Sequence, residues 1–221
     1  MIKLISFDFW DTLFKGNPEH SKSRISYISE KYKLDPEFVK KTIKETKKWC
    51  DDKGVETLSC IPPNTQLYFL GKNLGLSNFD VVDARLRFFE FLLQYPPICL
   101  VDQTNKNKLL ESAVQWCVSC NTGFMGELEA SWIIDNSPLQ GLFNFRLFSE
   151  KIGIFKPNPD WVNKISAMSA WLKSNEMIHV GDNDATDGQL CRNTGMHFVK
   201  VEPKNPDFSN IFEIIEKEKN G

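Results

Sequence analysis

The sequence predicts an α/β protein whose central parallel sheet is covered by helices on both faces. Beyond residue 100, short apolar segments typical of strands alternate with segments of helical spacing, as the crossover connections of a parallel sheet require. Residues 21–93 instead show helical spacing throughout, which indicates a helical insert after the first strand. Polar and acidic clusters directly follow the predicted strands, and in such sheets ligands bind beyond the carboxyl ends of the strands.

The first strand is predicted over residues 2–7, an apolar run rich in β-branched and aromatic residues that stops at an acidic cluster. The same signal recurs four times in the second half of the chain, and amphipathic segments separate these strands. The further strands are expected at 115–120, 145–149, 177–180 and 197–201, and the helices at 106–114, 127–134, 160–172, 187–193 and 209–217.

Prolines divide the helical insert. Pro36 follows an aspartate, and proline pairs stand at 62–63 and 96–97, so three or four helices are expected. The predicted organisation is therefore a core formed by residues 1–14 and 101–221, with a helical segment over residues 15–100 between its two parts.

Composition places the chain among folded proteins without an obvious macromolecular partner. Hydrophobic residues make up 41% and charged residues 25%, which is the balance of a soluble globular protein. The net charge is -2, with lysines and acids interleaved, so neither nucleic acid nor a membrane is expected as a partner. No apolar run approaches the roughly 20 residues of a membrane span, and we expect a cytoplasmic protein with its six cysteines reduced.

Three strand ends and one loop carry polar residues suited to chemistry. Asp8 follows the first strand, a Ser-Cys-Asn run ends the second, and a Gly-Asp pair with a further acid, Asp187, follows the fourth. Lys156-Pro157 stands in the loop between the second and fourth strands. Each of these alone is also typical of an ordinary turn or an exposed loop. Their occurrence together, in order and at strand ends, favours one composite site.

These motifs resemble the four motifs of the haloacid dehalogenase-like (HAD) superfamily of hydrolases. The resemblance covers about residues 1–14 and 100–221, and the helical segment corresponds in position to the cap that the family inserts after its first motif. It implies a Rossmann-like core with a helical cap, and a hydrolase that acts on a small phosphorylated substrate, most simply a phosphomonoester.

The resemblance also implies roles for the acidic residues and the lysine. Asp8 would be the nucleophile and form an aspartyl-phosphate. Mg²⁺ would be held by Asp8, the backbone oxygen of Trp10 and Asp182, because this ion prefers hard oxygen ligands. Asp187 would hold Lys156 or a metal-bound water. Lys156 would offset the negative charge of Asp8 and the phosphoryl group.

The second motif would bind the phosphoryl oxygens. Ser119, Cys120 and Asn121 are the candidates, together with Lys156. Cys120 occupies the place where the family has a serine or threonine, and a thiol is a poorer hydrogen-bond donor. Ser119 points to the opposite face of a regular strand, and a register shift of one residue would exchange the two side chains.

Trp10 is the second departure from the phosphatase pattern. Many related phosphatases have an aspartate there as general acid and base, a task that an indole cannot perform. Asp11 or a group of the substrate is expected to replace it. Haloacid dehalogenases also have an aromatic residue there and need no metal, so a metal-independent dehalogenase is one alternative and a non-catalytic binding protein is another. The metal-binding pattern of Asp182 and Asp187 favours phosphoryl transfer.

The three histidines, His20, His179 and His197, are isolated in the sequence. His179 lies inside a predicted strand, so we interpret it as a packed residue. The aromatic residues of the helical segment are expected to fill its own core, with some lining a roof over Asp8. No motif identifies the substrate or the oligomeric state.

Overall fold

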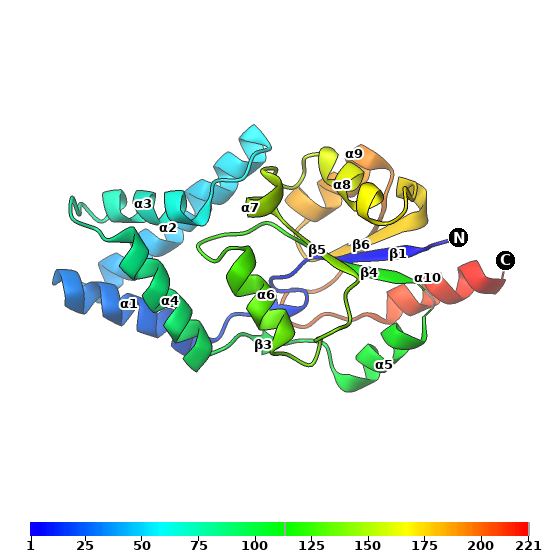
Figure 1. Ribbon diagram of the computed structural model, residues 1–221, viewed down its shortest axis with the longest axis horizontal. Coiled ribbons are helices and arrows are strands. Elements are labelled where there is room, and N and C mark those ends of the chain that lie inside the picture. Colours follow the sequence, from blue (N-terminus) through cyan, green and yellow to red (C-terminus); the bar gives the residue numbers. More distant parts are fainter. Residues whose placement is uncertain (113, 221) are drawn as a thin grey trace.

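The computed structural model describes residues 1–112 and 114–220, with side chains to residue 217. Its centre is a five-stranded sheet in the order β5-β4-β1-β6-β7, in which every neighbouring pair is parallel. The strands are β1 (Leu4–Phe7), β4 (Gln115–Cys120), β5 (Phe145–Phe148), β6 (Met177–Gly181) and β7 (His197–Lys200). Helices lie on both sides of this sheet (Figure 1), which confirms the predicted α/β class.

The sheet register aligns the chain segments that follow its three central strands. Phe7 of β1 lies opposite Val118 of β4 and Val180 of β6. The backbone N–H of Asp8 continues the ladder by donating to the carbonyl of Val180, at 2.8 Å. Because parallel strands end at a common edge, the residues that follow β1, β4 and β6 are brought together there.

Alternating side chains of the strands face two different hydrophobic clusters. Ile5 and Phe7 of β1 face the cluster that includes residues of α5 (Gln103–Glu111), α6 (Glu127–Asp135) and α10 (Ser209–Asn220). Leu4 faces the cluster formed with α8 (Asp160–Met168) and α9 (Gln189–Thr194). The sheet is therefore buried on both faces, as continuous apolar strands require.

Four helices form a separate unit beside the sheet (Figure 1): α1 (Pro18–Tyr32), α2 (Pro36–Thr57), α3 (Pro63–Asn73) and α4 (Val81–Gln94). The side chains of Asn17, Asp35 and Asp80 cap α1, α2 and α4 by accepting from backbone N–H groups of the first turn. The unit has its own cluster of buried residues, in which Ile28, Leu67 and Phe88 come from three different helices. The predicted boundaries of core and cap, at residues 14/15 and 100/101, remain a prediction.

Several short elements were not predicted from the sequence. The strands β2 (Phe14–Lys15) and β3 (Ile98–Cys99) form an antiparallel ribbon where the chain enters and leaves the helical unit. The helix α7 (Ser149–Ile152) has four residues and follows β5 directly. Two to four residues are too few to show a periodic pattern, so these elements depend on tertiary contacts.

Some predicted helix ends were wrong. The helix predicted over 160–172 ends at Met168, because Ala170 and Trp171 adopt φ values of 58° and 63° that are incompatible with a helix. The helix predicted over 106–114 begins earlier, because Asp102 caps its first turn through the N–H of Asn105, at 2.7 Å. Ala113, within that predicted range, lies outside the described residues.

Several contacts join the helical unit to the sheet unit, and two of them lie close to the candidate site or to α6. The segment after α2 runs beside the segment that carries Lys156: Phe155 N–H donates to the carbonyl of Leu58 at 3.1 Å, and Cys60 N–H donates to that of Gly153 at 3.1 Å. The second contact is an ion pair between Arg85 of α4 and Glu129 of α6, at 3.0 Å. The helical unit thus touches the loop that carries the candidate catalytic lysine.

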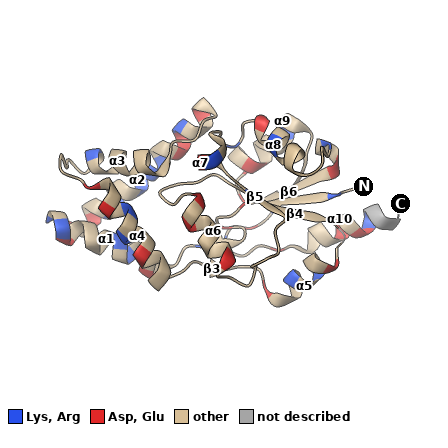
Figure 2. Ribbon diagram, in the orientation of Figure 1, with Lys and Arg blue, Asp and Glu red and all other residues tan. Residues whose placement is uncertain are grey.

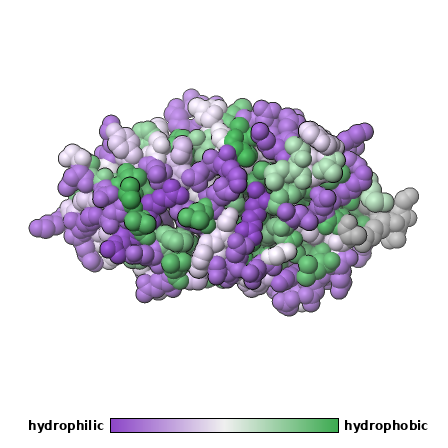
Figure 3. All heavy atoms as spheres, in the orientation of Figure 1, coloured by the Kyte–Doolittle hydropathy of each residue, from purple (hydrophilic) through white to green (hydrophobic). Residues whose placement is uncertain are grey.

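Charges of both signs are interspersed along the helices (Figure 2), in keeping with the small net charge. On the face shown in Figure 3, apolar side chains form small patches over α4 and α6 among hydrophilic ones. Val82, Leu86 and Leu128 are among the exposed apolar residues of these helices. Within the described part of the chain, no helix is both long and apolar enough to span a bilayer.

Leu67→Ala should destabilise the protein by about 2–5 kcal/mol, because the fully buried side chain leaves a cavity among tightly packed neighbours. Leu86→Ala is the matched control in the same helical unit, since that leucine is 59% exposed, and it should cost less than about 0.5 kcal/mol. Urea denaturation of both variants measures the difference. Equal losses would contradict a packed core inside the helical unit.

Candidate active site

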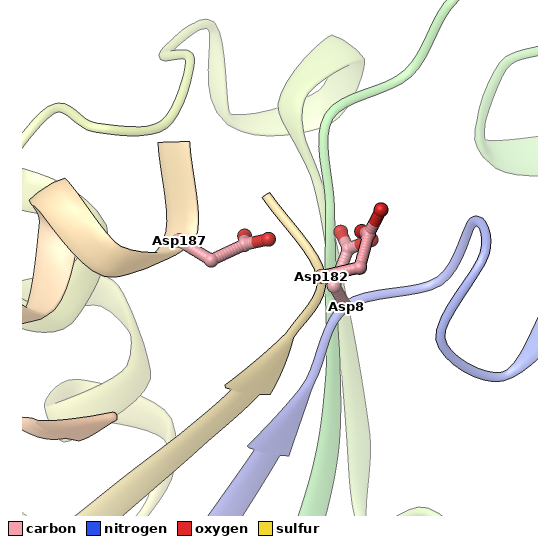
Figure 4. Close-up of side chains that lie close together, drawn as sticks. All are labelled: Asp8, Asp182 and Asp187. Atoms are coloured by element: carbon pink, nitrogen blue, oxygen red, sulfur yellow. The ribbon is translucent and has the colours of Figure 1, made fainter. Parts of the chain in front are cut away.

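Three aspartates meet at the carboxyl edge of the sheet. Asp8 directly follows β1 and Asp182 directly follows β6, while Asp187 lies in the π-helical turn η2 (Asp184–Gly188). One carboxylate oxygen of each lies within 4.8 Å of one from each of the others. Figure 4 shows the Asp8 and Asp182 carboxylates side by side, with Asp187 pointing toward them from its own turn.

Lys156 links two of these carboxylates. Its ammonium group donates to Oδ1 of Asp8 at 2.8 Å, to Oδ1 of Asp187 at 2.6 Å and to the carbonyl of Ser119 at 2.8 Å. An ammonium has three N–H groups, so every one of them has an acceptor. The side chain is only 1% exposed. The lysine is therefore fixed in position by its own hydrogen bonds.

Asp187 is in turn held from several sides. Its Oδ1 also accepts from Nε2 of His179 at 3.0 Å, and its Oδ2 accepts from the backbone N–H of Asn183 at 3.2 Å. Gly181 makes room for it, since a Cβ at this position would lie 2.4 Å from Oδ2 of Asp187. With its oxygens engaged, Asp187 acts as the anchor of Lys156, one of the two roles predicted for it.

His179 was interpreted as a packed residue, and it is fully buried in β6. It also belongs to the site, which the sequence analysis missed: its Nδ1 lies 3.1 Å from the hydroxyl of Ser6, and its Nε2–H reaches Asp187. Ser6 lies opposite His179 in the sheet register. An ionisable side chain inside an otherwise apolar strand was the available signal.

The pKa values of the buried ion pair reflect burial and mutual attraction. Burial alone would lower the pKa of Lys156, but the charges of Asp187 and Asp8 outweigh this effect and hold it above its usual value. Burial would raise the pKa of Asp187, but Lys156 and then His179 hold it below its usual range. Lys156 is therefore a cation and Asp187 an anion at neutral pH.

Asp8 and Asp182 behave differently from Asp187. Burial raises the pKa of Asp8, although Lys156 opposes this shift. Burial, followed by the charges of Asp8, Asp187 and Asp11, raises the pKa of Asp182 to about 6. Among the described residues, no side chain forms a hydrogen bond or an ion pair with the Asp182 carboxylate. The negative charges of the neighbouring aspartates thus disfavour ionisation of Asp182.

The cluster fits a divalent cation. When all groups are ionised, three carboxylates and one ammonium leave two negative charges uncompensated. Carboxylate oxygens are the ligands that Mg²⁺ prefers. Asp8 and Asp182 have oxygens available for it, whereas the Asp187 oxygens are engaged by the lysine, the histidine and a backbone N–H. The predicted ligand role of the Trp10 carbonyl, in the turn after Asp8, stays a prediction.

A cavity of about 410 Å³ opens next to this cluster, between the two units. Trp10 and Asp11 line it on the sheet side, and residues of α1 and α2 line it on the other. Trp10 also packs edge-on against Phe9, with ring centroids 4.8 Å apart. Asp11 has a φ of 58°, a conformation that aspartate tolerates better than most residues.

The predicted phosphate-binding residues at the end of β4 have different surroundings. The Ser119 hydroxyl is buried and has no hydrogen-bond partner among the described residues. Cys120 is buried too, and its thiol donates to the carbonyl of Asn121 at 3.4 Å. Asn121 lines the cavity, but its side chain also binds both backbone groups of Lys156, at 2.8 and 3.3 Å. Asn121 therefore positions the lysine, a role that was not predicted.

Comparisons with known proteins place this geometry in a structural context. No protein-family model matches the chain, and a search of curated proteins finds no match. Among solved structures, a predicted phosphoglycolate phosphatase from Haemophilus somnus 129PT has a TM-score of 0.66 at 16% identity, over 96% of this chain and 97% of that one.

Two further structures have the same architecture. A putative HAD hydrolase from Bacillus subtilis bound to magnesium has a TM-score of 0.64 at 14% identity, over 97% of this chain and 98% of that one. L-2-haloacid dehalogenase from Xanthobacter autotrophicus, with chloropropionic acid covalently bound, has a TM-score of 0.64 at 16% identity, over 91% and 78%. The chain therefore has the fold of the HAD-like hydrolases, as the motifs predicted.

Asp182→Asn should make the metal-free protein more stable at pH 7.5 than the wild type. Because the pKa of Asp182 is raised to about 6 in the folded state, folding without metal loses stability as the pH rises from about 4 through 6. The variant lacks this loss, so the two melting temperatures should converge below about pH 4. Thermal unfolding in chelator across this pH range measures the effect.

Mg²⁺ should raise the melting temperature of the wild type at pH 7.5, and much less at pH 5 or in Asp182→Asn. Asp184→Asn is the matched control, because Asp184 is exposed and paired with Arg192 at 2.9 Å. Equal stabilisation of both variants by Mg²⁺ would show that the ion binds elsewhere.

Proposed function

We propose that this protein is a Mg²⁺-dependent phosphatase or phosphotransferase that acts on a small phosphomonoester through an aspartyl-phosphate at Asp8. The observation that carries this proposal is the pairing of Asp8 with Asp182 beside a fully engaged Lys156, in a cluster with two uncompensated negative charges. Such a pair of carboxylates suits a divalent cation, and phosphoryl transfer chiefly requires positioning and charge neutralisation. The fold shared with HAD-like hydrolases supports the same reading.

In the proposed reaction, Asp8 is the nucleophile that attacks phosphorus. One of its oxygens, Oδ1, accepts from Lys156 and keeps a second lone pair for the cation, so Oδ2 is the oxygen that forms the new bond. The Asp8–phosphorus bond forms as the bond from phosphorus to the substrate oxygen breaks, and that oxygen leaves with a proton from an acid in the cavity. Attack of water on the aspartyl-phosphate then releases phosphate and restores Asp8. The bound Mg²⁺ would be held by Asp8 and Asp182 and would neutralise charge on the phosphoryl oxygens.

Lys156 favours the ionised form of the nucleophile and aligns it. Its charge opposes the effect of burial on the pKa of Asp8, and its hydrogen bond fixes the rotation of the carboxylate. Asp187 and His179 hold the lysine from behind, and Asn121 holds its backbone. The reacting carboxylate is therefore oriented before any substrate arrives, which lowers the entropic cost of reaction.

Asp11 is the candidate for proton transfer. Trp10 cannot exchange a proton, whereas Asp11 lines the same cavity and lies close enough to Asp182 to raise its pKa. A carboxyl group in this position can protonate the departing oxygen and later accept a proton from the attacking water.

Dehalogenation is the second candidate, and Trp10 is the observation that favours it. The aromatic residue two positions after Asp8 would suit an apolar halide-bearing substrate, and one structure of the same fold is a dehalogenase with chloropropionic acid covalently bound. Attack on carbon creates no phosphoryl charge and needs no metal. Halide release from a short haloacid in the presence of chelator would support this function. Ligand binding without turnover of either substrate class would instead support a non-catalytic binding protein.

Asp8→Asn should reduce the release of phosphate from an aryl phosphate by at least about a thousandfold, because the amide is not a nucleophile. The assay follows phosphate with Mg²⁺ and with chelator, and chelator should abolish wild-type activity. Asp184→Asn, at an exposed acid outside the cavity, is the matched control and should retain activity. Retention of activity by Asp8→Asn would rule out the aspartyl-phosphate.

Asp11→Asn should slow turnover of an alkyl phosphate by roughly a hundred- to ten-thousandfold, because the poor leaving group needs a proton. With p-nitrophenyl phosphate, whose leaving group needs none, a burst of one nitrophenolate per protein should persist while steady phosphate release falls. Asp52→Asn, at an exposed acid paired with Lys48, serves as the control. Equal slowing of the burst and the steady phase would argue against a proton-transfer role for Asp11.

A further inference from the structure

Arg24 of α1 lines the cavity beside the active site without a partner for its charge. Its Nε is buried and has no hydrogen-bond partner, and no described residue forms a hydrogen bond or an ion pair with any part of its guanidinium. The guanidinium lies over the ring of Phe88, 5.4 Å from the ring centroid. This stacking fixes where the group lies but leaves its N–H groups without acceptors.

The other arginines of the chain show that this is exceptional. Each of the remaining four, all among the described residues, pairs with a carboxylate. The pairs are Arg85–Glu129 at 3.0 Å, Arg87–Glu90 at 2.7 Å, Arg146–Asp135 at 2.5 Å and Arg192–Asp184 at 2.9 Å. Arg24, which is more buried than Arg87 and Arg192, has no such carboxylate among the described residues. Removing a cation from water without a counter-charge is costly, so a ligand anion would complete this position.

Neighbouring groups in the cavity do not supply that anion. Lys47 and Asp51 neutralise each other at 2.7 Å. Burial, assisted by the charge of Arg24, lowers the pKa of His20 to about 4, so this imidazole is neutral at pH 7. Burial lowers the pKa of Arg24 itself to about 10, which leaves it charged. Asp11, the remaining acid of the cavity lining, forms no ion pair with it among the described residues.

The cavity extends from Arg24 to residues that are next to Asp8 in the chain or bind Lys156. Trp10 and Asp11, the residues after Asp8, line its sheet side, and Asn121, which also lines it, binds the backbone of Lys156. Its volume of about 410 Å³ is within the range of small-molecule sites. A small molecule in this cavity would lie between Arg24 and the residues beside Asp8.

We propose that Arg24 binds a carboxylate carried by the leaving group of the substrate, so that the substrates are phosphorylated small carboxylic acids. This inference rests on the proposed function, since it assigns the other end of the same substrate. One unpaired positive charge matches the single charge of a carboxylate better than the double charge of a second phosphate. The planar guanidinium also presents parallel N–H groups that fit the two oxygens of a carboxylate.

The test compares two ligands that differ only in the carboxylate: a carboxyalkyl phosphate with two carbons and ethyl phosphate. Binding is measured by calorimetry on Asp8→Asn, which cannot turn them over, with Mg²⁺ present. The carboxylate compound should bind at least tenfold more tightly than ethyl phosphate. Adding Arg24→Met, which keeps an apolar side chain against Phe88, should reduce the ratio to about one, and Arg24→Lys should give an intermediate ratio.

Lys22→Met is the matched control, because Lys22 is an exposed cation of the same helix that pairs with Glu19 at 2.6 Å. It should keep the tenfold ratio. The proposal is overturned if the Asp8→Asn protein with Arg24 intact binds the two ligands equally well. It is also overturned if adding Arg24→Met leaves the ratio of the two affinities unchanged. Because the readout is binding, a preference that depends on Arg24 without phosphate release by the wild type would overturn the proposed function and leave the carboxylate site standing.

Discussion

The ion-paired ammonium of Lys156 is the interaction on which the rest of the site depends. It is 1% exposed and lies between Asp8 and Asp187, at 2.8 and 2.6 Å. Removing a buried partner from such an arrangement leaves an uncompensated charge, which is strongly destabilising. The strand register brings the two aspartates to the same edge, and Gly181 lets Asp187 approach the strand end. The fold thus concentrates negative charge at one point, and one lysine offsets only part of it.

The position of this lysine also depends on the helical unit. Leu58 and Cys60, after α2, hydrogen-bond to the backbone of Phe155 and Gly153, just before Lys156 in the chain. Asn121 fixes the lysine backbone from the sheet side. A displacement of the helical unit would therefore act on the loop that carries Lys156, as well as on the side of the cavity formed by α1 and α2.

The sequence predicts well those elements whose signal lies in consecutive residues. Buried strands such as β1 and β6 are continuous apolar runs, and the polar residues after them are visible because the pattern stops abruptly at Asp8 and Asp182. The contacts of His179 and Asn121 were missed because they depend on which strands are neighbours and on the path of a distant loop. Arg24 was equally invisible, since an arginine in an amphipathic helix is ordinary until the absence of a partner is known.

The choice between attack on phosphorus and attack on carbon turns on the cost of the Asp8–Asp182 pair. Burial, followed by the negative charge of Asp8, raises the pKa of Asp182 to about 6, so keeping both carboxylates ionised without a cation is costly. A dehalogenase gains nothing from such a pair, because its leaving halide carries away the charge that forms. In an enzyme that binds a divalent cation, the attraction of both carboxylates to the cation offsets the repulsion between them. Asp182, the acid directly after β6, is therefore the feature that separates the two chemistries, and it weighs more than Trp10, the aromatic residue two positions after Asp8.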